Sequence, residues 1–362
     1  MNQRDPRQGY ILVMTLMIIS ISVVLVSYMF NRQASYVPFM EAMAQREKAK
    51  MLALGGIQLA ISALVEEEEA KETTPGEEKK QRSQDEETKK FLARILPSLN
   101  RWQRFSLKEE VDGVEGQIHI CISCEDGKIN INEIYDFEKQ KFKGEGDPKA
   151  DYKKIMQELF AQLKESIGRD NLFEPFEKFL KERGYPLDDV TELLTIKEFA
   201  IFKRSVFYEP LLDEDKKGAQ KKKRPVFLTD LFTIWSNRHT IEPWLFSDSI
   251  KGMLGLRRVK EGDSKEWGAM IKGLLKEFKS TVQWSSDWNK FLGSAYEKDF
   301  TSLPKSIESI LSTKVEAKTF TVLSYGKAGE IGQKLLAIVQ REKGSKDKSI
   351  PYDVKVKKIY WI

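Results

Sequence analysis

The first pattern along the chain is a run of 21 residues without a charged side chain, from Tyr10 to Phe30. Twelve of these residues are Ile, Leu, Val or Phe, and four scattered Ser or Thr hydroxyls supply most of the polarity. Such hydroxyls can bond to carbonyls of their own helix, so they cost little in lipid. As a helix the run is about 31 Å long, which matches a hydrocarbon core of roughly 30 Å. The run predicts a transmembrane helix.

The length and the flanking residues of this run distinguish a membrane anchor from a cleaved secretory signal. A secretory signal has an apolar core of about 7–15 residues and then a small-x-small cleavage site. This run is longer and ends in Tyr28-Met29-Phe30-Asn31-Arg32, a poor site of that kind. Arg4 and Arg7 outweigh Asp5 in the leader, which favours a cytoplasmic N-terminus. From topology alone, a plain signal anchor satisfies the same pattern, with the rest of the chain in an oxidising compartment.

The helical pattern continues beyond the apolar run. An apolar stripe recurs at spacings of three, four and three residues, at Leu54, Ile57, Ile61 and Leu64. Beside it runs a stripe of small residues suited to close packing on a sheet: Ala53, Gly56, Ala60 and Ala63. The pair Gly55-Gly56 lowers helix propensity by about 1 kcal/mol per glycine, so tertiary contacts must support this part. We expect one long helix over 10–65, with its transmembrane part at 10–30.

A highly charged segment follows, and then the first strand pattern. Of the 25 residues from Glu66 to Lys90, 16 are charged, which predicts a mobile loop. Alternating isoleucines at 118, 120 and 122 predict a half-buried strand. Glu125-Asp126-Gly127 is read as a turn, with Ile129 and Ile131 on a return strand.

Near the C-terminus three strands are expected, at 320–324, 335–339 and 354–361. In the last of them Val354 and Val356 share one parity, whereas Ile359 and Trp361 share the other. A β-bulge near Lys357-Lys358 would bring all four side chains to one face.

The region from Tyr135 to Thr313 has helical periodicity throughout. Apolar stripes recur over 155–167, 176–180 and 267–278, and Pro304 suits the first turn of another helix. The hexamers Thr191–Ile196 and Thr229–Ile234 are alike, which suggests a small helical duplication. A surface loop is expected at 213–224.

Taken together, these features resemble the type IV pilin and pseudopilin class. The leader ends in Gly9, the apolar run starts at Tyr10, and the helix runs on past the membrane. Cys124–Asn132 resembles the family's D-x-x-G-K-[IL]-N-[IL]-N stretch, the two hexamers resemble helical turns of its inserted domain, and Phe320–Trp361 resembles its closing sheet.

One member of that class is the best match in two respects. Most members carry a glutamate at the fifth mature position, where this chain has Met14. The minor pseudopilin K of type II secretion systems resembles this chain in lacking that glutamate and in its large size. The family's Asn-x-Asn-Thr-Ala stretch is replaced around Thr240–Trp244, which indicates a divergent member.

The resemblance implies an α+β fold, in which a long N-terminal membrane-spanning helix packs on a pilin-like antiparallel sheet with a large inserted all-helical domain. The expected divisions are a prepilin leader at 1–9, the long helix at 10–65, a charged flexible loop at 66–90, a pilin-like head at 91–134 and 314–362, and the inserted helical domain at 135–313.

The resemblance also implies processing and partners. A prepilin peptidase would cut after Gly9 and methylate Tyr10, and the head would lie in the periplasm with the chain anchored in the inner membrane. The expected partners are other minor pseudopilins and the inner-membrane assembly platform. The expected role is a structural subunit at the tip of a pseudopilus for protein export, not an enzyme. The alternatives are a minor pilin of a type IV pilus and a single-pass anchored periplasmic binding protein.

Composition and chemistry-bearing residues add little to this interpretation. Apolar residues make up 41% and charged residues 32%, with a net charge of only +5 and both signs interspersed, so no nucleic-acid partner is indicated. His119 and His239 are the only histidines, and neither has a nucleophile and carboxylate at motif spacing.

Two further groups of residues have alternative readings. Cys121 and Cys124 would point to opposite faces of a strand, although a disulfide becomes feasible if the strand ends at Ser123. Some relatives of the family bind calcium, which could involve Glu209, Asp213, Glu214 and Asp215, but a solvated acidic loop explains these residues better. No cofactor or metal is therefore expected. Gly252 and Gly255 are read as helix C-caps.

Overall fold

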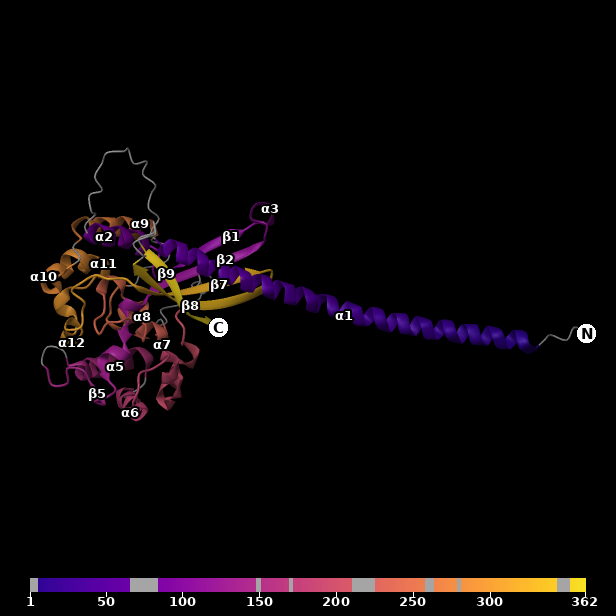
Figure 1. The fold of residues 1–362 in the computed structure, drawn as a ribbon, viewed down its shortest axis with the longest axis horizontal. Helices are drawn as coiled ribbons and strands as arrows, with labels where there is room; N and C mark the ends of the chain where they lie inside the picture. The colour runs from indigo at the N-terminus through magenta and orange to yellow at the C-terminus, as the bar shows by residue number, and fades with distance from the viewer. Residues whose placement is uncertain are drawn as a thin grey trace, which may run out of the picture.

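A single helix dominates the shape of the molecule. The computed structural model describes residues 6–65, 84–147, 151–168, 172–209, 225–257, 264–278, 281–343 and 352–362. Helix α1 (Pro6–Leu64) is 59 residues long and runs through Pro38 without interruption. Its first half projects from the head, and its second half lies against the sheet (Figure 1). The expected long helix is confirmed, and Val13–Phe30 is apolar and long enough to cross a membrane.

The head is built on one antiparallel sheet. Its five strands lie in the order β1-β2-β7-β8-β9. Their bounds are β1 (Trp102–Leu107), β2 (Gly116–Cys124), β7 (Thr319–Ala328), β8 (Ile331–Lys343) and β9 (Tyr352–Trp361). A register shift lies at Ile338/Val339, opposite Lys358 and Val356, so Lys357 is the extra residue of a β-bulge. The expected bulge is confirmed, and the C-terminal strands are longer than the sequence pattern indicates.

Helix α1 packs on the face of this sheet formed by β2, β7 and β8. The packed face carries Ala49, Leu52, Ala53, Ile57, Ala60 and Leu64, all at most 6% exposed. Burying a leucine or isoleucine of this kind stabilises the fold by about 1.5–3 kcal/mol. The small residues set the distance between helix and sheet, because a Cβ at Gly56 would overlap the side chains of Ser324 and Ile118. The predicted stripe of small residues is therefore the sheet-facing stripe.

The region between the two parts of the sheet is mainly helical. Two further helices precede it, α2 (Gln84–Ile95) and α3 (Glu109–Asp112). Its α-helices are α4 (Ile131–Ile134), α5 (Tyr152–Ile167), α6 (Phe173–Arg183), α7 (Leu228–Leu231), α8 (Asp248–Met253), α9 (Ser264–Leu274), α10 (Trp284–Trp288), α11 (Ser294–Tyr296) and α12 (Lys305–Glu308). Its 3₁₀ turns include η2 (Val190–Thr195), η3 (Lys197–Arg204), η5 (Pro243–Leu245), η7 (Leu275–Glu277) and η9 (Phe300–Ser302), and η8 (Asn289–Gly293) is a π-helical turn.

Local chemistry sets the ends of these helices. The Asp151 carboxylate accepts the backbone N–H groups of Lys153 and Lys154 at the start of α5. The glycine that follows α5, Gly168, adopts a left-handed conformation with φ 73° and closes its last turn. Gly255 closes α8 in a similar way with φ 65°, which agrees with its reading as a helix C-cap, whereas the same reading of Gly252 is wrong because Gly252 lies within α8.

The expected hairpin after β2 is wrong. Residues 125–127 form the 3₁₀ turn η1 (Glu125–Gly127), but the chain then leaves the main sheet. Strand β3 (Ile129–Asn130) pairs in parallel with β6 (Phe232–Thr233) of the inserted region, and Ile131 begins α4. Gly127 permits this path, because any Cβ there would overlap the Leu245 carbonyl. The alternating isoleucines continue past β2 because both segments are buried, not because they share a sheet.

Three other expectations need correction. Residues 66–83 of the expected charged loop lie outside the described residues, but Gln84–Lys90 form the start of α2 instead of a loop. The inserted region is not wholly helical, since it holds β6 and the pair β4 (Tyr135–Asp136) and β5 (Lys141–Phe142). The two hexamers also differ in structure. The first lies in η2, whereas the second is divided between α7 and β6.

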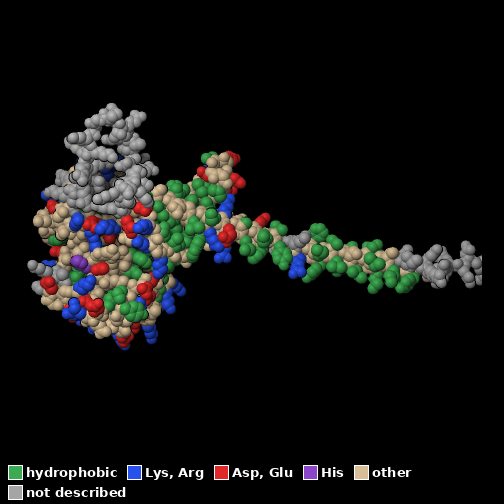
Figure 2. Space-filling view, in the orientation of Figure 1, with side chains coloured by type: hydrophobic (Ala, Val, Ile, Leu, Met, Phe, Trp, Pro, Cys, Tyr) green, Lys and Arg blue, Asp and Glu red, His purple; other side chains and the backbone are tan. Residues whose placement is uncertain are grey.

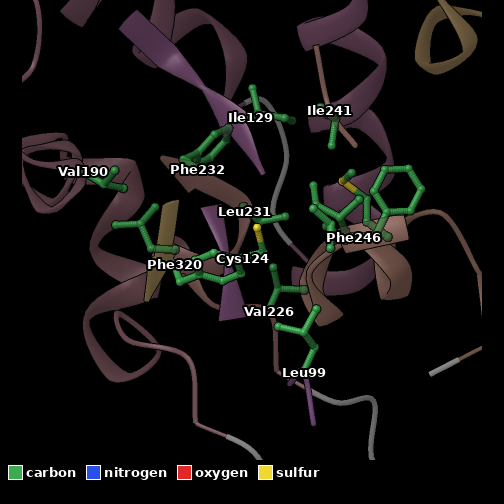
Figure 3. Packing of buried hydrophobic residues seen from close by; sticks show 14 of the residues in the cluster. Leu99, Cys124, Ile129, Val190, Val226, Leu231, Phe232, Ile241, Phe246 and Phe320 are labelled. Carbon is green, nitrogen blue, oxygen red and sulfur yellow. The ribbon is translucent and has the colours of Figure 1, made fainter. Parts of the chain in front are cut away.

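The inserted region and the sheet share one continuous hydrophobic core. Cys124 and Phe320 come from the sheet, and Leu231, Phe232 and Phe246 come from the inserted region. Figure 3 shows these side chains packed in one cluster with Ile129. The inserted region is thus packed on the sheet through apolar side chains.

The aromatic centre of the inserted region predicts a large loss on truncation. Phe176 is fully buried, and its ring lies 5.3 Å from that of Phe160 and 6.0 Å from that of Phe232. Phe176→Ala is expected to lower the free energy of unfolding by about 4 kcal/mol, because it leaves a cavity among rigid rings. Phe105→Ala serves as the control, since Phe105 is 38% exposed and its loss should cost under ~1 kcal/mol. Urea titrations of both variants in detergent would measure the difference, and equal losses would contradict this packing.

Candidate assembly surface

A long exposed apolar surface lies on the first half of α1. The large apolar side chains that the structure describes between Tyr10 and Met43 are 47% to 68% exposed. None of the apolar window Val13–Phe30 is buried by the rest of the chain. Figure 2 shows hydrophobic side chains along the visible face of the projecting helix. Lipid can cover the window itself, so the exposed side chains beyond it need another partner.

The exposed apolar side chains continue past the end of the apolar window. They are Tyr36, Val37, Phe39, Met40 and Met43, and each is 49% exposed or more. Met43 lies 13 residues after Phe30, or about 20 Å further along the helix axis. Water is a poor environment for such a contiguous apolar surface, which marks a protein or membrane contact. We call this segment, from Tyr36 to Met43, the helix collar.

A second exposed apolar strip lies on the edge strand β9. On the two sides of the bulge, Val356, Ile359 and Trp361 pair with residues of β8 whose side chains face α1. Because α1 covers β2, β7 and β8, these three side chains stay 41–54% exposed, and the C-terminal Ile362 is 44% exposed. Apolar side chains also gather on the head beside α1 in Figure 2. We call Val356, Ile359, Trp361 and Ile362 the edge strip.

A polar contact fixes β9 to the inserted region and so holds the edge strip in place. The Asp189 carboxylate accepts hydrogen bonds from the Lys358 ammonium, at 2.8 Å, and from the Tyr360 hydroxyl. Burial alone would raise the pKa of Asp189, but these hydrogen bonds and those from Thr191 outweigh it and lower the pKa. Ionised Asp189 therefore stabilises this contact at neutral pH.

The residues expected to be processed lie together at the start of α1. Gly9 falls in its first turn, Tyr10 is 66% exposed, and Met14 is 47% exposed. An exposed apolar side chain occupies the fifth position after Gly9, where the pilin class usually carries a carboxylate. Cleavage and methylation at this point stay predictions.

The residues considered for catalysis or metal binding do not converge. His119 lies between the rings of Trp102 and Tyr325, and burial, with Arg104 and Lys327 nearby, lowers its pKa. His239 lies apart from it, against Tyr152. In the part of the chain that the structure describes, no group of three or more His, Cys, Asp or Glu residues could hold a metal ion. Of the acidic residues considered for calcium, Glu209 pairs with Lys334, and residues 213–215 lie outside the described ranges.

The two cysteines lie on opposite faces of β2, as the strand pattern predicts. Both thiols are buried and free. Cys121 packs with Trp102 and Leu323, whereas Cys124 belongs to the core that includes Phe320. Burial raises the pKa of both thiols well above its ordinary value, so they are poor nucleophiles.

A hollow of about 380 Å³ lies where α1 leaves the head. Gln45 and Lys48 line it from α1, Glu115 from just before β2, Gln117 from β2 and Lys327 from β7. Its lining contains a single carboxylate and no histidine or cysteine.

Comparison with known proteins finds similarity in structure but not in sequence. No family model matches the sequence, and no curated protein matches it. The fold is similar to a chain in the crystal structure of the GspK-GspI-GspJ complex from the enterotoxigenic Escherichia coli type 2 secretion system. The two chains are 14% identical with a TM-score of 0.40, over 91% of this chain and 99% of the other. At that identity and score, the similarity does not by itself assign the chain to a family.

The sequence pattern did not indicate the helix collar or the edge strip as surfaces. The collar residues fit a continuing helix equally well whether buried or exposed. The edge strip follows from two facts of topology, namely that β9 is the last strand of the sheet and that α1 stops short of it. The bulge at Lys357 was the available signal, because it places Val356, Ile359 and Trp361 on one face.

Proposed function

We propose that this chain is a structural subunit of a type II secretion pseudopilus, a divergent minor pseudopilin of the K class. The observation that carries the proposal is the unbroken helix α1, with its first half apolar and exposed and its second half packed on an antiparallel sheet. An enzyme anchored to a membrane needs only a spanning segment and a tether. A fibre subunit needs a rigid helix that transmits the position of the membrane segment to the head.

In this proposal a prepilin peptidase removes the leader after Gly9, and Tyr10 becomes the methylated N-terminus in the inner membrane. In the pilin class, the glutamate at the fifth mature position is thought to meet the N-terminus of the neighbouring subunit. Met14 cannot make that ionic contact. A subunit with no other subunit above it has no need of the contact, which supports a position at the tip of the fibre, where assembly begins.

The helix collar and the edge strip are the proposed contacts with other minor pseudopilins. A partner anchored in the same bilayer by a similar helix would present apolar side chains at the height of the collar. Burial of the collar against such helices would remove a large apolar surface from water at about 25 cal/mol per Å². The inner-membrane assembly platform would then contact the membrane-spanning parts of the same helices.

The edge strip gives a specific test of these contacts. Trp361→Glu places a charge in the strip, and we expect it to abolish co-purification of the chain with other minor pseudopilins from detergent extracts. Val111→Glu is the matched control, because Val111 is an exposed apolar residue, 80% exposed, on α3 away from the strip. Retained co-purification in the Trp361→Glu variant, with normal folding by circular dichroism, would contradict this contact.

Deletion of the chain in its native host tests the function itself. The expected result is loss of exported proteins from the culture medium while surface pili remain. Loss of pili with normal export would favour the minor pilin of a type IV pilus, which the same helix and sheet would suit. Unchanged export and unchanged pili would overturn the proposal and would leave the single-pass anchored binding protein as the remaining alternative.

A further inference from the structure

A group of buried hydrogen bonds joins α7 to the start of α8. One oxygen of the Asp230 carboxylate, Oδ2, accepts the backbone N–H of Ser249 at 2.7 Å. The Ser247 hydroxyl donates to the Asp230 carbonyl, and the Phe227 backbone N–H donates to the Ser249 hydroxyl at 3.1 Å. We call α7 and α8, joined in this way, the α7–α8 clamp.

The clamp is also tied to the sheet. The Tyr208 hydroxyl donates to Asp248 Oδ2 at 2.9 Å and lies 3.2 Å from the Asn100 carbonyl, just before β1. The Asn100 side-chain amide in turn donates to the Phe246 carbonyl at 3.3 Å, just before α8. The clamp therefore lies at the joint between the inserted region and the sheet, and opening it would remove these hydrogen bonds while the shared apolar core remains.

Asp230 lies at the centre of this joint with little support for a negative charge. Its side chain is fully buried, and its second oxygen, Oδ1, has no hydrogen-bond partner among the described residues. The cation that faces it is Lys128, whose ammonium already pairs with Glu125. The Glu125 carboxylate also accepts the Thr321 hydroxyl. One buried ammonium thus serves two buried carboxylates.

The other groups that face Asp230 do not supply a positive charge. Asp248 of α8 adds a second negative charge. The ammonium of Lys251, on the same helix, pairs with Asp248 at 3.7 Å. Burial raises the pKa of the Cys121 thiol and of the Tyr208 hydroxyl, so both stay uncharged near neutral pH. The charge balance of the joint therefore depends on whether Asp230 carries a proton.

We propose that the α7–α8 clamp is a pH-responsive joint, held closed by uncharged Asp230 in acid and loosened by its carboxylate near neutral pH. Loosening would give the inserted region freedom relative to the sheet that carries the membrane helix. This inference goes beyond the proposed function and does not depend on it, because it rests only on contacts within the head.

The direction of the effect follows from proton linkage. Burial, with a further contribution from Asp248, raises the pKa of Asp230 from 3.8 to about 6, and Lys128 and the hydrogen bonds from Ser249 oppose part of that rise. In an open clamp the carboxyl meets water and titrates near its ordinary value. Below that value both states hold the proton, and pH does not affect closure. As pH rises towards 6, the open state loses its proton first, so the closed state weakens by up to tenfold per pH unit and then levels off.

Hydrogen exchange of the full chain in detergent tests this joint. After correction for the intrinsic exchange rate, amides of 226–231 and 247–254 should open about 30-fold more readily at pH 7.5 than at pH 4.5. Asp230→Asn keeps the shape of the side chain without the titration, and its opening should change less than about 3-fold. Glu242→Gln is the matched control, since Glu242 is also buried but accepts the Trp244 backbone N–H outside the clamp. It should keep the wild-type pH dependence.

Two outcomes would overturn the proposal. The first is wild-type exchange in these segments that does not change with pH, a result that needs no variant to fold. The second is a pH dependence that persists in Asp230→Asn and disappears in Glu242→Gln, which would assign the effect to Glu242. The contact between Asp189 and Lys358 gives a comparison of opposite sign. Because the pKa of Asp189 is lowered, this contact should weaken only when the pH falls below the ordinary pKa of an aspartate, and Asp189→Asn should remove that dependence.

Discussion

Replacing Gly326 by alanine is expected to lower the free energy of unfolding by about 3 kcal/mol or more. Gly326 lies on β7 directly beneath α1, and a Cβ at this position would overlap the backbone of Ala49 and Ala53. Backbone atoms of a helix cannot move aside as a flexible side chain can. The helix must therefore lift from the sheet over several residues, which opens the contact that joins the membrane segment to the head.

Thermal unfolding of the purified chain in detergent would measure this effect. A loss of 3 kcal/mol corresponds to a fall in Tm of roughly 6–12 °C for a domain of this size. Gly268→Ala is the matched control, because Gly268 lies inside α9 and an added Cβ would meet no atom within 4 Å. That change should be neutral or stabilise by up to about 1 kcal/mol. Equal Tm values for Gly326→Ala and wild type would contradict the close packing of α1 on β7.

The second large effect is expected at Gly9. If a peptidase recognises the end of the leader, Gly9→Val should leave the chain with its first nine residues in place. The unprocessed chain would stay in the membrane and export should fall to the level of a strain that lacks the chain. The branched side chain should not disturb the head, because Gly9 belongs to the first turn of α1 and the first half of α1 projects from the head (Figure 1).

Immunoblots of membrane fractions would show the unprocessed chain as a larger species. Gln8→Ala is the control, since it changes the adjacent leader residue without altering the glycine. Export at the wild-type level in the Gly9→Val strain would contradict the prediction, because it would show that the chain works without processing.

Long sequence patterns were sufficient to predict those parts of the fold in which a single physical requirement acts on many residues. The span at 10–30 has to match a bilayer, and the stripe at Ala53, Gly56 and Ala60 has to face a close neighbour. Both requirements act on many residues at once. The helix over the span and the burial of the stripe are confirmed, whereas insertion of the span in a membrane stays a prediction. The bulge at Lys357 followed from a change of parity within one strand.

The parts that the sequence did not predict depend on contacts between distant segments. Ile129 and Ile131 continue the alternation of β2, yet Ile129 pairs with Phe232, more than a hundred residues away. The hexamers share a pattern, but in the second one Phe232 and Thr233 form the short strand β6, which pairs with β3. The charges at Asp230 and Lys128 meet only in the folded chain, and no spacing of residues indicates that they do.

The residues of the candidate surface also fall into a predictable and an unpredictable group. The positions of Tyr10 and Met14 on the helix could be predicted, because they are fixed by distance from the start of the apolar run. The edge strip was not, because its exposure depends on which strand ends the sheet and on how far α1 reaches across it.

The most direct test of a processed fibre subunit is the mass of the N-terminal peptide of the chain isolated from its native host. The account predicts a peptide that begins at Tyr10, lacks the nine residues of the leader and carries one added methyl group on its amine. A peptide that still begins with the leader, or a mature chain that begins beyond Phe30, would contradict it.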